Sequence, residues 1–190
     1  MARYKSQYPP SFDSTYIKAT TEFSVSYPTY ATASPYSDLT GGSDYNQWYS
    51  GSGEDTNQRF HIDLGLAKAI KRIYYENSHT DGIKTGRGAK NIIVQGSNEA
   101  SAFANLEYLT DDDWTDIATY ADQDLTVVKT LFDEHVGLDQ PDPKYLYLDN
   151  DVKYRYYAIK IADNYGETFM GIRRVELQKR QPRRPGIIYY

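Results

Sequence analysis

The sequence predicts an all-β fold, either a sandwich or a barrel, with long loops and at most one or two short helices. Two observations lead to this prediction: short stretches alternate apolar and polar residues, and the 3.6-residue apolar period of helices is nearly absent. The 190 residues suffice for one domain, and they include no cysteine. Disulfides and thiolate metal sites are therefore excluded, and the fold must depend on an apolar core.

The clearest strand is FHIDLG at 60–65, which places three apolar side chains on one face and His61 and Asp63 on the other. A shift of one residue would bury this pair, so the apolar face fixes the register. We expect His61 and Asp63 on a solvated or hydrogen-bonded outer face; the alternative is a contact role. Further strands are expected at 69–77, 91–97, 154–164 and 171–178, and one within 16–25.

The remaining segments predict one short helix and one long loop. NEASAFANLE (98–107) suits one or two helical turns, with Ser97 or Asn98 as the cap. The stretch 31–56 is rich in Ser, Gly, Asp and Thr, and long loops in compact domains tend to be functional. We therefore divide the chain into a Tyr- and Pro-rich arm (1–30), a β-sandwich domain (31–178) and a basic tail (179–190).

Charge and composition narrow the function classes. The net charge of −5 and the pI of about 5.2 argue against duplex nucleic acid as a partner. The basic run KRQPRR at 179–184 is either a solvated tail or a docking segment for an acidic partner. We expect neither a signal peptide nor a transmembrane segment, because no apolar run approaches about 20 residues. The 20 tyrosines against 6 phenylalanines indicate extensive contact surface.

Catalytic motifs are missing from the sequence. The histidines lack HExxH spacing, no G-x-S-x-G motif is present, and the acidic residues at 111–113 and Asp116 suit a solvated loop. TGRGAKN at 85–91 does not match the phosphate-binding P-loop pattern, so we interpret it as a loop between strands. We expect a protein that is not an enzyme.

Five motifs occur in an order that resembles a known family: NQWYSG, RFHIDLG, IIVQGSNEASAF, YRYYAIKIADNYG and GIRRVELQ. This is the discoidin, or coagulation factor 5/8 type C, family, a galactose-binding-like jelly-roll β-sandwich that also includes many carbohydrate-binding modules. The match covers roughly 31–178. The stretches GIKTGRGAKN, GSNEASAFANL and GIRRVEL also resemble the variant of this domain found on bacteriophage virion proteins.

The resemblance implies that ligands meet the loops at one end of the sandwich. Sugars are held by an aromatic ring against the apolar ring face and by hydrogen bonds to the hydroxyls. The alternative is that these loops pack against neighbouring subunits, and Trp48 is expected in the core. The candidate rings are Tyr45, Tyr49, Tyr165 and Phe169, and the candidate hydrogen-bonding residues are His79, Arg87, Asn164 and Glu167.

Some members of the family carry a structural calcium ion, for which Asp38 and Glu176 are the nearest counterparts here. The spacing from Asp38 to Trp48 is longer than the family's usual spacing. Calcium takes six to eight oxygen ligands, and the sequence offers only these two side chains plus backbone carbonyls. The resemblance therefore leaves calcium open as a cofactor.

Two functions follow from the resemblance. The first is a structural component of a phage tail or capsid decoration, joined to other subunits of an oligomeric assembly through the two termini. The second is a lectin-like module that recognises host-surface glycans. Both would place the protein on a virion or an extracellular surface.

Overall fold

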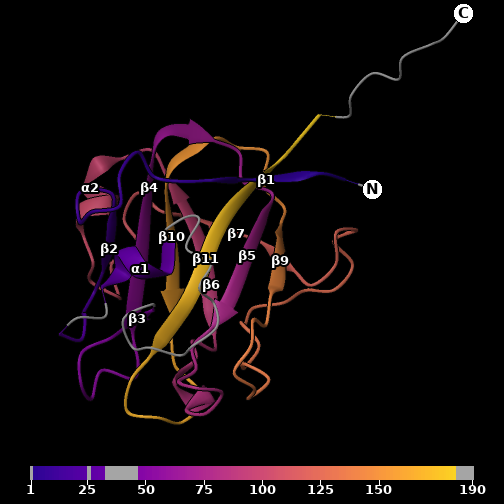
Figure 1. The fold of residues 1–190 in the computed structure, drawn as a ribbon. Helices are drawn as coiled ribbons and strands as arrows, with labels where there is room; N and C mark the ends of the chain where they lie inside the picture. Colours follow the sequence, from indigo (N-terminus) through magenta and orange to yellow (C-terminus); the bar gives the residue numbers. More distant parts are fainter. Residues whose placement is uncertain (1, 25–26, 33–46, 183–190) are drawn as a thin grey trace, which may run out of the picture.

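Two antiparallel β-sheets face each other in the computed structural model, which describes residues 2–24, 27–32 and 47–182 (Figure 1). The first sheet has the order β1-β11-β5-β9-β8, with β3 paired to β11, and the second has the order β2-β4-β10-β6-β7. Very little helix is present in these described residues, and the predicted all-β class is confirmed.

The elements have the following bounds. The first sheet contains β1 (Tyr4–Gln7), β3 (Trp48–Tyr49), β5 (Arg72–Asn77), β8 (Thr119–Tyr120), β9 (Lys144–Leu148) and β11 (Gly171–Arg180). The second contains β2 (Ile17–Ala19), β4 (Gln58–Lys68), β6 (Ile92–Ser97), β7 (Thr115–Ile117) and β10 (Tyr154–Ile161). The helical elements are α1 (Pro28–Thr32), η2 (Thr85–Arg87) and α2 (Ala100–Ala104). No helix in these described ranges is long and apolar enough to cross a membrane.

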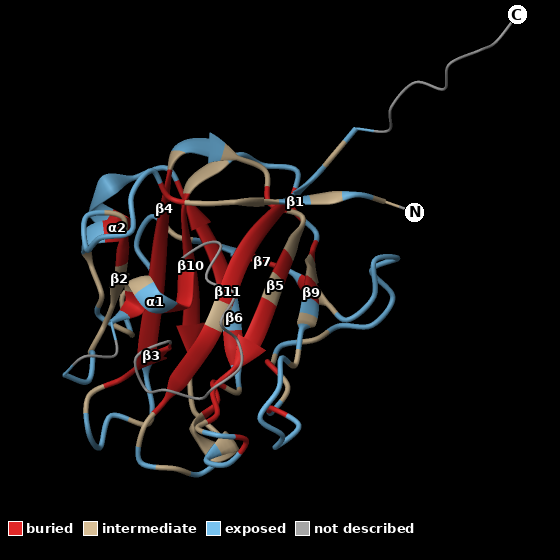
Figure 2. Cartoon of the chain, in the orientation of Figure 1, coloured by how far each residue is buried: buried red, intermediate tan, exposed pale blue. Residues whose placement is uncertain are grey.

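The apolar core lies between the sheets, on the faces that the sequence alternation predicts. Phe60, Ile62 and Leu64 are buried, as are the inward residues of β5, β6, β10 and β11. Trp48 is fully buried with its ring 5.4 Å from that of Phe60, in agreement with its expected core position. Figure 2 shows buried strands and largely exposed loops.

His61 and Asp63 point away from this core, but both are buried, so the expected solvent exposure is wrong. The hydrogen-bonded alternative is correct. His61 Nδ1 lies 3.1 Å from the carbonyl oxygen of Phe103, and its ring lies 4.9 Å from that of Trp114. Asp63 accepts two hydrogen bonds from Arg155, at 2.9 and 2.8 Å. Segments distant in sequence therefore cover the outer face of β4.

The first 32 residues contribute more regular structure than the sequence predicts. β2 lies within the expected 16–25 stretch and pairs with β4, but β1, which pairs along β11, and the short helix α1 were not anticipated. α2 forms inside the expected 98–107 stretch. Its N-cap is Glu99 rather than Ser97 or Asn98, and Ser97 Oγ accepts the Glu99 N–H at 3.0 Å.

Gly96 on β6 provides a test of the packing. A Cβ atom at this position would lie 2.2 Å from the ring of Tyr154. We expect Gly96→Ala to lower the free energy of unfolding by about 2 kcal/mol, because the ring must move. Urea denaturation measures this change. The control is Ile93→Ala on the same strand, whose side chain is half exposed, and the prediction is wrong if both variants lose equally little.

Candidate functional site

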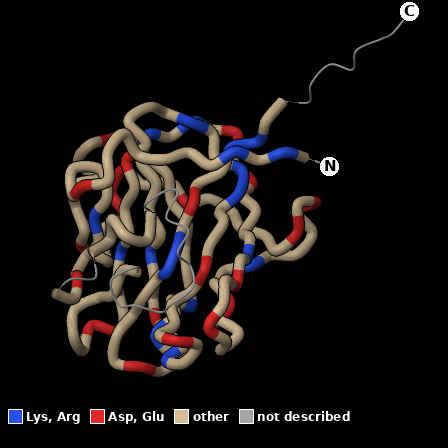
Figure 3. The backbone as a smooth tube through the Cα atoms, viewed as in Figure 1, with Lys and Arg blue, Asp and Glu red and all other residues tan. Residues whose placement is uncertain are grey.

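Four loops meet at one end of the sandwich because of the strand register. Ile161 pairs with both Gln58 and Ile92, and Gly171 pairs with Tyr49. The loops at 50–57, 78–91 and 162–170 therefore lie at the same end, and the segment before β9 joins them because Lys144 pairs with Tyr75. These loops lie at the bottom in Figure 1. Acidic and basic residues are interspersed over the described chain, so individual contacts decide the local electrostatics (Figure 3).

An arginine and aromatic rings come together on these loops. The Arg87 guanidinium lies 5.2 Å from the ring centroid of Tyr49 and 5.3 Å from that of Phe169, within cation–π range. Phe23 packs edge-on against Phe169, at 5.0 Å between centroids, and 39% of it is exposed. Glu167 lies beside them, with its carboxylate 4.0 Å from the Lys84 ammonium. We refer to Phe23, Arg87, Glu167 and Phe169 as the loop-end site.

Asn164 and Tyr165 hold the loop that carries this site. The Asn164 side-chain amide donates to the carbonyl oxygens of Glu167 and Phe169, at 2.6 and 2.7 Å, and its oxygen accepts the Gly166 N–H at 2.8 Å. The Tyr165 hydroxyl donates to the Phe132 carbonyl oxygen at 2.6 Å. Both side chains thus position the site from within the loop.

His79 and Tyr49 lie beneath the surface, in contrast to the expectation that they contact ligand directly. The His79 ring stacks on His135 at 4.0 Å, and its Nδ1 accepts the Gly82 N–H at 3.0 Å. Burial, together with the neighbouring His135, lowers the pKa of His79 to about 4. His79 is therefore neutral at pH 7, and it fixes a turn that lies behind the site.

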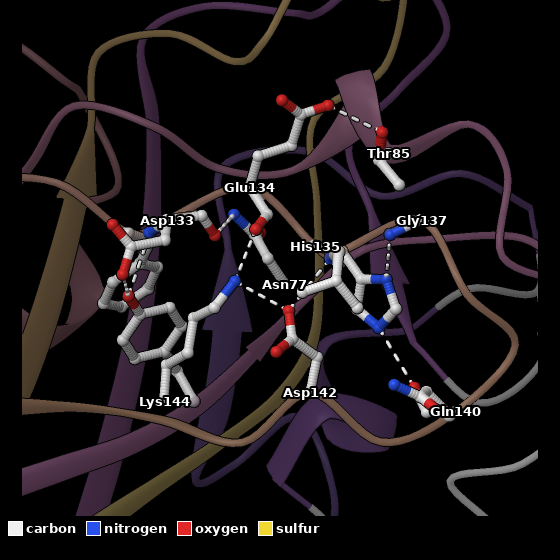
Figure 4. Close-up of polar contacts among 12 residues, drawn as sticks. Asn77, Thr85, Asp133, Glu134, His135, Gly137, Gln140, Asp142 and Lys144 are labelled. Carbon is white, nitrogen blue, oxygen red and sulfur yellow. Dashed lines mark hydrogen bonds and ion pairs between the residues drawn. The ribbon is translucent and has the colours of Figure 1, made fainter.

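His135 fixes a second turn, at 135–137, in the loop that faces the 78–91 loop. Its Nδ1 accepts the Gly137 N–H at 3.2 Å, so its Nε2 carries the proton and donates to the Gln140 carbonyl oxygen at 3.1 Å (Figure 4). Burial also lowers the pKa of His135. The two stacked histidines thereby join the turn at 79–82 to the turn at 135–137.

Further contacts fix the loop that bears Arg87 (Figure 4). Thr85 Oγ1 donates to the Glu134 carboxylate at 2.6 Å, and the Asn77 amide at the end of β5 donates to the carbonyl oxygens of both Ala89 and Asp133, at 2.7 and 3.1 Å. Lys144 pairs with Asp142 at 2.6 Å and also donates to the Glu134 carbonyl oxygen. Protein contacts therefore hold the 78–91 loop in place.

Several of the candidate residues named from the sequence lie at this site. The structure brings Arg87 and Phe169 into contact and Asn164 holds the loop that carries Glu167 and Phe169, whereas Tyr45 lies outside the described residues; ligand binding by these residues stays a prediction. Phe23 was missed, because it belongs to the N-terminal segment and no motif marks it. Only the fold reveals that its ring packs on Phe169.

Glu176 does not meet a calcium-type donor set in this structure. Its carboxylate pairs with the Arg174 guanidinium, at 2.6 Å from Nε, and accepts the Ser6 hydroxyl at 2.5 Å. Asp38 lies outside the described residues. Within the described ranges, no three His, Asp or Glu side chains form a group that could hold a metal ion. A carboxylate already paired with the Arg174 cation is poorly placed to bind calcium. Calcium binding stays a prediction.

Comparisons with known proteins agree with this architecture. No family model and no curated protein matches the sequence. Among solved structures, a CBM32 module from Clostridium perfringens, CpGH89CBM32-5, in complex with GalNAc-β-1,3-galactose is 14% identical with a TM-score of 0.56, over 85% of this chain and 92% of that one.

Two further structures are similar. The family 32 carbohydrate-binding module of C. perfringens NanJ in complex with galactose is 14% identical with a TM-score of 0.55, over 93% of this chain and 100% of that one. A chitosan-binding module from Paenibacillus is 13% identical with a TM-score of 0.56, over 85% and 92%. At such identities the likeness concerns the fold alone, and it shows that this chain has the galactose-binding-like jelly-roll fold of the family 32 carbohydrate-binding modules.

Proposed function

We propose that the protein is a non-catalytic carbohydrate-binding module whose ligand is a glycan bound at the loop-end site. The observation that carries the proposal is the half-exposed Phe23–Phe169 pair with the Arg87 guanidinium against it. The rings offer apolar area to the C–H face of a sugar, while Arg87 donates hydrogen bonds to its hydroxyls and Glu167 accepts them. The similar modules described above bind sugars, as their names state.

The support of the loops favours binding without large rearrangement. Asn164 fixes the backbone on either side of Phe169, and Thr85 and Asn77 tie the Arg87 loop to its neighbour. Preorganisation of this kind reduces the entropy that a ligand must overcome on binding. The site thus meets a glycan with its contact groups already in position.

Arg87→Ala and Phe169→Ala test this function. We expect each to weaken binding to glycans that the wild type captures on an array by roughly tenfold or more, because a cation or a stacking ring is lost. Arg3→Ala is the matched control, since Arg3 is exposed near β1 at the opposite end of the sandwich. A wild-type protein that captures no glycan, or an Arg87 variant that binds like the Arg3 variant, would rule the proposal out.

The structural role in a virion, with subunit contacts through the termini, remains a prediction from the sequence resemblance. Such a role is compatible with glycan binding, because β1 and the end of β11 lie at the end of the sandwich opposite the loops (Figure 1). Deletion of 179–190 followed by a test of incorporation into particles examines it separately. Recognition of host-surface glycans would place the module on a virion or an extracellular surface.

A further inference from the structure

We propose that the loop-end site continues into a groove along the edge of β2, so that the ligand is an oligosaccharide chain rather than a single terminal sugar. This inference rests on the proposed function and specifies its ligand. The groove has a volume of about 800 Å³ and is lined by residues of β2 and by the first residues of α1, among others. We refer to it as the edge groove; its lining includes Phe12, Lys18, Thr21, Glu22, Tyr27 and Leu106.

One short segment of the chain connects the groove to the site. Thr20, Thr21 and Glu22 line the groove, and the next residue, Phe23, packs on Phe169 in the loop-end site. This segment is firmly held, because the Phe23 N–H donates to the Tyr49 carbonyl oxygen at 2.9 Å and Thr21 Oγ1 accepts the Gly51 N–H at 3.0 Å. A chain whose first sugar rests on Phe23 can therefore extend along a fixed surface.

The lining suits a sugar chain. Phe12 and Tyr27 are large rings exposed by 41% and 39%, and each can stack on a sugar ring. Lys18 and Glu22 also line the groove and contribute charged groups, whereas the Thr21 hydroxyl is already bonded to Gln58 and Gly51. A mixed lining of this type matches the alternating apolar faces and hydroxyl edges of a glycan.

The edge of β2 supplies additional hydrogen-bonding groups. Tyr16 and Thr20 bond through their backbones to β4, as shown by the Asp63 N–H to Tyr16 carbonyl bond at 2.7 Å and the Thr20 N–H to Arg59 carbonyl bond at 3.0 Å. In an antiparallel pair alternate residues face the partner, so the backbone groups of Ala19 point away from β4. β2 is the last strand of its sheet, and Ala19 lines the groove.

Chain-length dependence tests the inference. The probes are series of one to six sugars of chitosan oligosaccharide, oligomannuronate and β-galactan, titrated by calorimetry against the full chain. For the series that binds, we expect the tetrasaccharide to bind roughly tenfold or more tightly than the monosaccharide, because a further ring is engaged. Phe12→Ala and Tyr27→Ala should each remove most of this gain and leave monosaccharide binding unchanged.

Tyr145→Ala is the matched control, because Tyr145 is an equally exposed ring (38%) on β9 of the other sheet. Equal affinity for all chain lengths, or Phe12 and Tyr27 variants that behave like the Tyr145 variant, would overturn the inference while the proposed function stands. Failure of every series to bind would overturn both. Binding of an extended peptide in the groove, detected as shifted amide resonances of Ala19 without any sugar effect, would also overturn it.

Discussion

Acidification from pH 7 to pH 4 is expected to lower the free energy of unfolding by several kcal/mol, because all three histidines of the chain are buried. Burial lowers the pKa of His61 and of His79 to about 4, and it also lowers that of His135. In the unfolded chain these groups titrate near pH 6.5. We expect roughly 3 kcal/mol from each of His61 and His79.

The direction of the effect follows from proton uptake. Between about pH 6.5 and pH 4 the unfolded chain binds protons that the folded chain does not, so stability is complete above this window and falls as the pH falls through it. Each Nδ1 of the stacked pair accepts a backbone N–H, and a protonated ring cannot accept. Arg173 lowers the pKa of His79 further, whereas Asp139 and Asp142 raise it.

Urea denaturation at half-unit pH steps measures this effect. Near pH 5 the slope should approach roughly 2.5 kcal/mol per pH unit for the protons of His61 and His79, with a further contribution of the same sign from His135, and His79→Gln should reduce the slope by about 1.2. Burial raises the pKa of Glu76, which offsets part of the loss at the acidic end. A wild-type stability that stays constant from pH 7 to pH 4.5 would contradict the assignment of buried neutral histidines.

The core could be predicted from the sequence because strand alternation is a local property. Phe60, Ile62 and Leu64 face inward as their spacing requires, and so do the apolar residues of β10 and β11. The covering of His61 could not be predicted, because Phe103 and Trp114 reach it only after the sheet has formed. β1 could not be predicted either, because it forms only by pairing with β11, which lies near the other end of the sequence.

In the candidate site, too, local sequence indicates which loops are involved, whereas tertiary contacts decide which side chains are accessible. Arg87 and Phe169 became candidates because they lie in loops at one end of the expected sandwich, but sequence cannot separate a contact side chain from one buried beneath it. His79 and Tyr49 have the chemistry of sugar contacts, yet they lie under Arg87 and the 78–91 loop. Phe23 lacks any motif, and its role depends on a tertiary contact with Phe169.

Replacement of Arg59 by alanine is expected to cost about 3 kcal/mol, because its guanidinium is fully buried and its removal leaves several hydrogen-bond acceptors without their donor. The guanidinium donates to the carbonyl oxygens of Glu107 and Thr110, at 3.0 and 2.7 Å, and pairs with Asp111. It also donates to Gln95 Oε1 at 2.9 Å. Arg59→Ala should therefore release the 105–111 segment from the second sheet.

Asp111 is exposed, as expected for a solvated acidic loop, and it is also the anion of this network and pairs with Lys160 at 2.6 Å. Burial alone would raise its pKa, but hydrogen bonds from Lys160, Gln95 and Arg59 lower the pKa of Asp111 to about 2. The contribution of ionised Asp111 to the free energy of unfolding is complete above the ordinary pKa of 3.8, and it is lost as the pH falls through about 2. This window lies below that of the histidines, so the two effects separate in a pH series.

The separate pH ranges in which the histidines and Asp111 titrate provide a control for each of these two groups. Asp111→Asn should flatten the stability curve below pH 4 and leave the slope near pH 5 unchanged, whereas His79→Gln should do the reverse.

Lys71→Ala removes an ion pair with the exposed Asp151 and should cost less than about 1 kcal/mol. If Arg59→Ala were no more destabilising than Lys71→Ala, the guanidinium would not be anchoring the loop. Since Leu106 belongs to that segment and lines the edge groove, Arg59→Ala should also weaken oligosaccharide binding at temperatures where the variant remains folded.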